Sequence, residues 1–238
     1  YRLQMEGKVC ISSDGKFAAF NTGLVNSGYD EIYACFVPYE SEIYDTKWRF
    51  SSFCLAGDRS GRGDGKTLVK YFHPLPQVAS YFNQLTDLLY DPKRDLIPDK
   101  RHIIVDNIAR LPMGFLREEC NDPSAQRLLD VVEQAQTATE RKVLFTQLAE
   151  LIESNARLNN RLCNRLQDAI DLAVKRVTWN YKTAIPLYYP KGNCMSLMLP
   201  LSLQDDTKAD AALVTQLVES GVYQGQTILT LDQAYVDA

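Results

Sequence analysis

A long helical stretch in the second half of the chain constrains the fold most. From Asp122 to Val177 the composition favours helix almost throughout, and a single helix of that length would exceed the width of the domain. The stretch must therefore break. Capping residues at 137–139 and at 154–155 predict the breaks, which divide it into about three helices within an insertion over about 122–178.

The last of these helices is predicted to carry an apolar stripe beside a row of arginines. The apolar residues recur at helical spacing, at Leu158, Leu162, Leu166, Ile170, Ala173 and Val177. Arg157, Arg161 and Arg165 each come one position before one of the first three. The arginines therefore border the face that we expect to be buried.

Short strands are predicted on both sides of the helical stretch. An Asp-Gly turn within Ser13 to Lys16 lies between two apolar runs and predicts a hairpin, with further strands over Glu31 to Val37 and Lys47 to Cys54. Near the C-terminus, turns at 190–193 and at Gly221 predict two more hairpins. The predicted fold class is α+β, an antiparallel sheet from N- and C-terminal hairpins with a helical middle segment.

Two elements are predicted between the first strands and the helical stretch. After Pro76, apolar residues at helical spacing from Val78 to Leu89 predict a helix of roughly four turns. His102 to Val105 predicts a short buried strand. That strand would run into the polar residues Asp106 and Asn107, and polar residues at a strand end indicate a site or a turn.

The composition is that of an ordinary globular protein. The hydrophobic share is 45% and the charged share is 24%. No segment has the composition of a flexible linker, so we expect one domain over residues 1–238. The chain starts at a tyrosine and stops inside a pattern that looks unfinished, which predicts the C-terminal part of a longer protein.

The cysteines give an expectation about the cellular compartment. The six of them are scattered, with no Cys-x-x-Cys pair and no histidine at ligand spacing. This pattern predicts reduced core cysteines in a cytoplasmic protein and makes a zinc site improbable. No run reaches the roughly 18 apolar residues of a membrane span, so we expect no membrane partner.

Positive charge is concentrated in one segment of an otherwise acidic chain. The net charge is −4, yet residues 156–182 carry six cationic residues against Asp168 and Asp171. The segment leads into Arg176 to Tyr189, where arginine and lysine meet tryptophan and tyrosine. Such cations neutralise phosphate, and aromatic rings stack on bases. The predicted partner is therefore RNA or a nucleotide, bound by a domain that acts in RNA metabolism.

Four motifs carry a resemblance to a known family. They are Phe20 to Leu24, His102 to Asn107 with Arg110, Asn180 to Ala184 with Pro186, Tyr188 and Tyr189, and Thr227 to Asp232 with Ala234 and Tyr235. They resemble the signatures of the bacterial domain-of-unknown-function family numbered thirty-eight twenty-five. The resemblance implies a domain that follows nucleic-acid-binding modules of the cold-shock, OB or LOTUS type, which points to RNA. It implies no catalytic residues, because none are established for the family.

Ten residues are candidates for RNA or nucleotide binding. They are Asn21, Asn107, Arg157, Arg161, Arg165, Arg176, Asn180, Tyr181, Lys182 and Tyr188. Lys182 would anchor a phosphate while Trp179 or Tyr181 stacks on a base, and the arginines would follow a phosphate backbone.

Structural explanations are open for the same residues. Trp179 would pack in the core, Asn180 would cap the helix, and Lys182 would interact with the helix dipole. The arginines would pair with acidic neighbours. Asn21 would belong to an ordinary turn in place of an anion-binding one.

Three further residues, Asp106, Arg110 and Asp232, are candidates for catalysis. In an enzyme of RNA-end or nucleotide processing, they would perform phosphoryl or nucleotidyl chemistry with a divalent metal. An Asp106–Arg110 ion pair and an Asp232 N-cap are the structural alternatives. We expect structural roles for the only histidines, His73 and His102. The sequence leaves open whether the chain is an enzyme, a binding domain or a protein-interaction scaffold with an acidic contact face.

Overall fold

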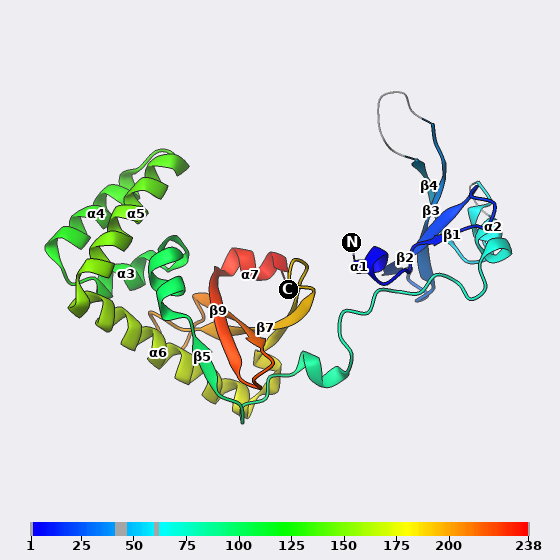
Figure 1. Cartoon of the computed structure of the whole chain (residues 1–238). Coiled ribbons are helices and arrows are strands. Elements are labelled where there is room, and N and C mark those ends of the chain that lie inside the picture. The colour runs from blue at the N-terminus through cyan, green and yellow to red at the C-terminus, as the bar shows by residue number, and fades with distance from the viewer. Residues whose placement is uncertain (1, 41–46, 60–61, 238) are drawn as a thin grey trace. The chain divides into compact units, whose positions relative to one another are not determined.

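The computed structural model describes residues 2–40, 47–59 and 62–237. The chain divides into two compact units, residues 1–81 and 82–238, which are blue to cyan and cyan to red in Figure 1. Each unit is described by itself. The expectation of one domain stays a prediction.

The N-terminal unit is a four-stranded antiparallel sheet in the order β1-β2-β3-β4. Its elements are α1 Arg2–Met5, β1 Cys10–Ile11, β2 Ala18–Val25, β3 Glu31–Pro38, β4 Trp48–Leu55 and α2 Asp64–Tyr71. The predicted hairpin and the two strands after it are confirmed. Leu68 of α2 packs with Phe17, Tyr33 and Cys35 on one face of the sheet, which forms the core of this unit.

A β-bulge in β4 decides which of its side chains face the core. Phe36 pairs with Phe50 and the residue before Phe36 pairs with Ser52, so Ser51 is an extra residue on β4. Ser51 and Ser52 both donate hydrogen bonds to the buried carboxylate of Asp64, at 2.7 and 2.5 Å. The bulge thus ties β4 to the first turn of α2.

The same bulge builds a row of phenylalanine rings on the other face of the sheet. Residues three apart on a regular strand point to opposite faces, but Phe50 and Phe53 lie with their ring centroids 4.9 Å apart. The ring centroid of Phe36 lies 5.6 Å from that of Phe20 and 5.7 Å from that of Phe50. Phe50 and Phe53 are exposed.

The C-terminal unit is built on a five-stranded sheet in the order β5-β9-β8-β7-β6. Its strands are β5 Leu96–Pro98, β6 Ile185–Tyr189, β7 Cys194–Leu201, β8 Ala211–Leu217 and β9 Tyr223–Thr230. The two predicted C-terminal hairpins are confirmed. The α+β class is confirmed too, although the strands form two sheets and β5 joins the second one in parallel to β9.

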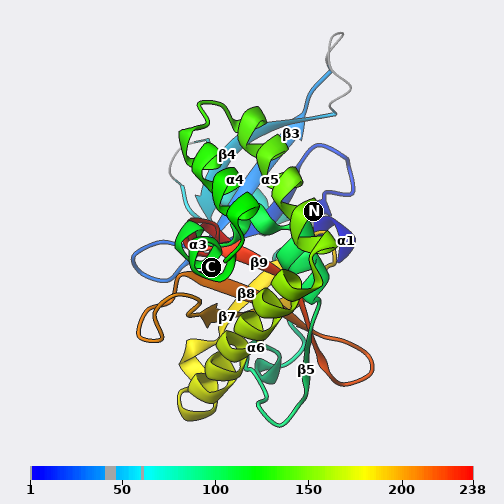
Figure 2. The same cartoon turned by 90° about the vertical axis from the view of Figure 1, so that its left-hand side faces the viewer.

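Helices precede and cover this second sheet. They are η1 Leu85–Leu88, η2 His102–Asp106, η3 Ile108–Arg110, α3 Met113–Glu119, α4 Pro123–Gln134, α5 Ala138–Ser154, α6 Ala156–Trp179, η4 Tyr181–Thr183 and α7 Leu231–Asp237. The predicted division of the helical stretch is confirmed, with Asp122, Thr137 and Asn155 as N-caps of α4, α5 and α6. Figure 2 shows α6 crossing one face of the sheet. Every residue of the predicted apolar stripe is buried there.

Two predicted elements are wrong. The helix after Pro76 is absent from the described residues, and only the short η1 forms. Its apolar positions stay exposed, so no buried face stabilises a longer helix: Val78, Phe82, Leu85 and Leu89. The predicted strand from His102 to Val105 is the π-helical turn η2. A buried apolar run of this length is compatible with a strand or with a helical turn. The strand in this region is β5, which ends earlier, at Pro98.

The C-terminal helix begins with a reciprocal cap. Thr230 Oγ1 accepts from the Gln233 amide at 3.3 Å, and Gln233 Oε1 accepts from the Thr230 amide at 3.2 Å. The expected N-cap at Asp232 is therefore wrong, because Asp232 lies inside the first turn. Within the described residues, no helix is both long and apolar enough to cross a bilayer.

Candidate functional site

A pocket of about 480 Å³ lies on the face of the second sheet that points away from α6. We call it the sheet-face pocket. Strands β6 to β9 and the turns η2 and η3 provide its lining, which consists of His102, Asn107, Arg110, Leu187, Tyr189, Ser196, Val214, Gln226, Thr227 and Leu229. Most of these side chains are polar. The lining therefore combines hydrogen-bond groups with the apolar side chains of Leu187, Val214 and Leu229.

A second β-bulge directs polar side chains of β9 into the pocket. Val214 pairs with Thr227, and the next residue of β8 pairs with Gly225, so Gln226 is the extra residue. Gln226 and Thr227 therefore both line the pocket although they are neighbours on a strand. Gln226 Nε2 donates to Gln216 Oε1 at 2.5 Å, which holds its amide in place.

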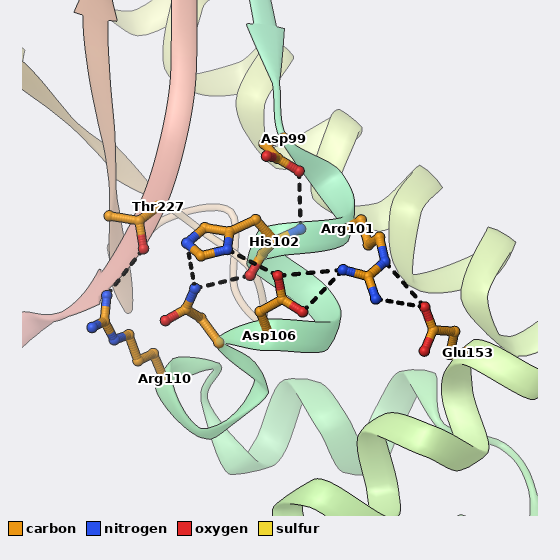
Figure 3. Close-up of polar contacts among 8 residues, drawn as sticks. Asp99, Arg101, His102, Asp106, Arg110, Glu153 and Thr227 are labelled. Atoms are coloured by element: carbon orange, nitrogen blue, oxygen red, sulfur yellow. Dashed lines mark hydrogen bonds and ion pairs between the residues drawn. The ribbon is translucent and has the colours of Figure 1, made fainter.

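The turn η2 presents His102 to the pocket with a carboxylate behind its ring. His102 Nδ1 lies 3.0 Å from Asp106 Oδ2, and Arg101 Nη1 donates to Asp106 Oδ1 at 3.2 Å. Arg101 in turn forms an ion pair with Glu153, with Arg101 Nη2 2.8 Å from Glu153 Oε1. Figure 3 shows this chain of contacts and the Asp99 carboxylate that accepts from the His102 amide. An orienting carboxylate of this kind fixes the tautomer of an imidazole.

Asn107 contacts the other side of the same histidine. Its Nδ2 lies 2.9 Å from His102 Nε2 and also donates to the His102 carbonyl at 2.9 Å. With Nδ1–H given to Asp106, Nε2 is the acceptor of this pair. The ring therefore presents a basic nitrogen on the side where Asn107 lines the pocket.

Arg110 lies at the same end of the pocket. Its Nη1 donates to Thr227 Oγ1 at 3.0 Å and to the Ile228 carbonyl at 3.1 Å, as Figure 3 shows for Thr227. Both bonds use one nitrogen of the guanidinium, whose five N–H groups suit planar anions. The expected Asp106–Arg110 ion pair is wrong, since the arginine that holds Asp106 is Arg101.

One hydroxyl in the lining lacks a partner. Ser196 is 2% exposed, and among the described residues its Oγ has no hydrogen-bond partner. Buried hydroxyls are nearly always hydrogen-bonded, because an unpaired one costs about 1–3 kcal/mol. Ser196 thus leaves a buried hydroxyl without a partner in the described structure, at the wall of the pocket.

The fold brings three of the four family-like motifs to this pocket. His102, Asn107 and Arg110 come from one motif, Tyr189 from the second and Thr227 from the third. Their positions in the sequence span more than half of the chain. Their convergence makes the pocket the best candidate for a functional site.

The arginine row of α6 lies elsewhere, in a groove of about 760 Å³. This arginine groove is lined by Glu119, Arg157, Asn160, Arg161, Asn164, Arg165 and Asp168. Arg161 pairs with Glu119 at 2.7 Å, and Arg165 pairs with Asp206 at 3.4 Å. These carboxylates partly neutralise the row. Phosphate binding by Arg157, Arg161 and Arg165 stays a prediction.

Arg176 has structural partners. Its Nη1 donates to the buried Ser202 Oγ at 2.8 Å, and its Nη2 bonds the carbonyl of Asp206. It therefore fastens the end of α6 to the segment after β7. The Arg176 side chain thus helps to pack α6 onto the sheet.

An exposed cluster follows the end of α6, and we call it the aromatic corner: Trp179, Tyr181 and Lys182. Trp179 is 92% exposed, so its expected packing in the core is wrong. Lys182 Nζ lies 6.0 Å from the centroid of the exposed Tyr181 ring. Asn180 sits at the C-cap of α6, and its Oδ1 accepts from the Lys182 amide at 3.2 Å.

Two other binding candidates do not line the sheet-face pocket. Tyr188 donates to Asn193 Oδ1 at 2.7 Å within the β6–β7 hairpin. Asn21 belongs to the N-terminal unit, where it is 1% exposed and its Oδ1 accepts from the Gly23 amide at 3.0 Å. Gly23 has a positive φ of 75°, which makes this an ordinary side-chain-capped turn within an irregular strand.

The three catalytic candidates, Asp106, Arg110 and Asp232, have different surroundings. Asp106 orients His102 in η2, Arg110 contacts β9, and Asp232 is exposed on α7. In the described parts of the chain, no three His, Cys, Asp or Glu side chains gather as a metal site. The six cysteines are free thiols, and burial raises the pKa of the Cys120 thiol to about 11.

Several pocket residues have only a weak signal in the sequence. His102 was expected to be structural, although the His-x-x-x-Asp spacing places both side chains on one face of a helical turn. Tyr188 is a binding candidate from the sequence, but its neighbour Tyr189 lines the pocket. Which of two adjacent strand residues faces a pocket depends on strand register. Ser196 and Gln226 carry no local signal, and Thr227 stands out only as the first residue of a family-like motif.

Comparison with known proteins agrees with the motifs. The family model described as a domain of unknown function (DUF3825) matches residues 1–238. The chain belongs to the DUF3825 family. No curated protein and no solved structure matches it. For this DUF3825 chain, function has to be inferred from the sheet-face pocket itself.

Proposed function

We propose that this chain binds single-stranded RNA and seats one of its nucleotides in the sheet-face pocket. The observation that carries the proposal is the meeting of Arg110, His102 and Tyr189 in one pocket. A guanidinium suits a phosphate, and a tyrosine ring suits a base. The volume of about 480 Å³ lies within the range of roughly 300–1,000 Å³ of small-ligand sites.

The polar lining supports a nucleotide over a purely apolar ligand. The Gln226 amide, the Thr227 hydroxyl and the unpartnered Ser196 hydroxyl provide hydrogen-bond groups of both kinds. The apolar lining residues Leu187, Val214 and Leu229 offer a surface for a base ring or a ribose. A bound nucleotide would use both kinds of surface.

The aromatic corner supports contact with a longer chain. Tyr181 is an exposed ring beside Lys182, and Trp179 is exposed two positions before Tyr181; such rings stack on bases, and the lysine attracts phosphate. We assign these three residues to the nucleotides outside the pocket.

The proposal extends to a role in RNA metabolism in the cytoplasm of a bacterium. Six free thiols suit a reducing compartment, and Cys35 and Cys54 lie with their sulfurs 3.4 Å apart without a disulfide. A nucleic-acid-binding domain in the same polypeptide would add affinity through a second contact with the RNA.

Binding can be tested directly with the purified chain. The ratio of absorbance at 260 and 280 nm and mass spectrometry identify any copurified nucleotide or RNA. Calorimetry with each nucleoside monophosphate and with short single-stranded RNA then measures affinity at low salt. Binding that is lost in Arg110→Met and kept in the surface variant Arg141→Met supports the pocket. A chain that binds neither probe at low salt overturns the proposal.

A further inference from the structure

We infer that the sheet-face pocket is a catalytic site in which His102 acts as the general base in cleavage of RNA by its own 2′-hydroxyl. The inference rests on the proposed function, because the pocket must first hold a nucleotide of RNA. It adds a reaction, its substrate class and the residues that touch the reacting atoms.

The geometry of His102 is that of an oriented base. Asp106 lies 3.0 Å from Nδ1, so Nε2 carries the lone pair, and the Glu153–Arg101 pair fixes the Asp106 carboxylate from behind. The His102 side chain is 44% exposed, so a substrate can reach it.

Asn107 marks where the substrate proton would lie. Its amide N–H points at Nε2 from 2.9 Å, the position that a substrate hydroxyl must take to give up its proton. The same nitrogen also donates to the His102 carbonyl at 2.9 Å. Asn107 can therefore release Nε2 to the substrate and keep its other hydrogen bond.

The reaction needs these side chains, the RNA and solvent water. His102 Nε2 takes the proton of a ribose 2′-hydroxyl, and that oxygen forms a bond to the adjacent phosphorus. The bond from phosphorus to O5′ breaks on the opposite side, O5′ takes a proton from water, and the imidazolium returns its proton to the solvent. The products are a 2′,3′-cyclic phosphate and a 5′-hydroxyl. Arg110 stabilises the negative charge that develops on the phosphoryl oxygens.

The groups that line the pocket suit this reaction. They combine one oriented imidazole with one guanidinium. A base and a cation of this kind suffice when the nucleophile belongs to the substrate.

The test compares a short single-stranded RNA with the same strand carrying 2′-deoxyribose throughout. The whole chain is incubated with each in the presence of EDTA, and the ends of the products are identified by mass spectrometry. We expect RNA to be cleaved to cyclic phosphates and the deoxy strand to stay intact. His102→Gln should lower the rate by about 100-fold or more while RNA affinity is kept. His73→Ala, which changes the only other histidine, should cleave like the unchanged protein.

One further variant and three outcomes decide the inference. Asp106→Asn should lower kcat with KM unchanged, because Asp106 is a positioning residue. RNA that binds but is never cleaved overturns this inference and leaves the proposed function in place. Cleavage of the deoxy strand, or cleavage that persists in His102→Gln prepared in parallel, also overturns it. Absence of RNA binding overturns both proposals.

Discussion

Arg110 Nη1 donates a hydrogen bond of 3.0 Å to Thr227 Oγ1 and so ties the turn η3 to strand β9 across 117 positions of the sequence. The contact fixes the guanidinium at the end of the sheet-face pocket where His102 and Asn107 also lie. Thr227 faces the pocket because it pairs with Val214 and lies two positions before Leu229 on β9, and both of those residues also line the pocket.

Arg110→Met should weaken binding of a nucleoside monophosphate by about 10- to 100-fold. Methionine keeps much of the apolar stem and removes the charge-assisted hydrogen bonds to phosphate, which contribute about 1.5–3 kcal/mol. Calorimetry at low salt measures the change. Arg141→Met, on the exposed face of α5, is the control. Equal affinities of the two variants would contradict a phosphate at Arg110.

Ser196→Ala should leave the free energy of unfolding unchanged or raise it by about 1 kcal/mol, while nucleotide affinity falls. The buried hydroxyl has no partner in the described structure, so its removal relieves a desolvation cost. Ser202→Ala is the matched change, because Ser202 is buried and accepts from Arg176. That variant should lose about 1–3 kcal/mol in urea unfolding. A similar loss in Ser196→Ala would show that its hydroxyl already has a partner.

Gly65→Ala should destabilise the N-terminal unit by about 1–3 kcal/mol. An added Cβ would lie 2.3 Å from the Leu55 carbonyl oxygen, where backbone of β4 meets the first turn of α2. Fluorescence of the half-buried Trp48 follows unfolding of this unit, since the exposed Trp179 changes little. Gly28→Ala, whose Cβ would meet side-chain atoms at 3.3 Å or more, should change stability by less than about 0.5 kcal/mol.

Asp14 should make the stability of the N-terminal unit depend on pH in the acid range. Its pKa is lowered from the ordinary 3.8 to about 2, first by the Ser12 hydroxyl, then by the Lys16 amide and the Tyr71 hydroxyl. Because the folded pKa is depressed, the contribution is complete above about pH 4 and is lost as the pH falls to about 2. Asp14→Asn should therefore differ from the unchanged protein in urea unfolding at neutral pH and converge with it near pH 2. A difference that stays constant over this range would exclude the carboxylate as its source.

Trp179→Ala and Lys182→Ala should weaken binding of single-stranded RNA and leave the melting temperature unchanged. Stacking on one aromatic ring contributes about 1–3 kcal/mol per base, and Trp179 is 92% exposed, so no packing is lost. Binding of a mononucleotide should be unaffected, because the aromatic corner does not line the pocket. Lys142→Ala on the exposed side of α5 controls for the loss of a positive charge. A lower melting temperature with unchanged RNA affinity would assign these residues to stability.

Part of the candidate site was visible in the sequence and part was not. Arg110 and Asn107 were singled out because they follow an apolar run, and both line the pocket. His102 was undervalued, since a lone histidine carries no local sign of the carboxylate behind it. The arginine row was predicted from helical spacing, but its partners Glu119 and Asp206 come from other segments. Pairing with acidic neighbours is one of the two interpretations that the sequence offers for this row, but which carboxylates pair with it cannot be predicted from spacing within one helix.

Local interactions let the sequence by itself determine the helices after Asp122 and the hairpins at both ends. A capping side chain bonds to amides within three residues, and a tight turn needs only its own residues, so both leave a signal in a short window. The tertiary structure alone decided the sheet-face pocket. Its geometry depends on the pairing of β8 with β9, on the bulge at Gln226 and on the packing of η2 and η3 beside β9. The contacts of η2 and η3 with β9 join segments more than 100 positions apart, and the bulge depends on a strand register that no local pattern encodes.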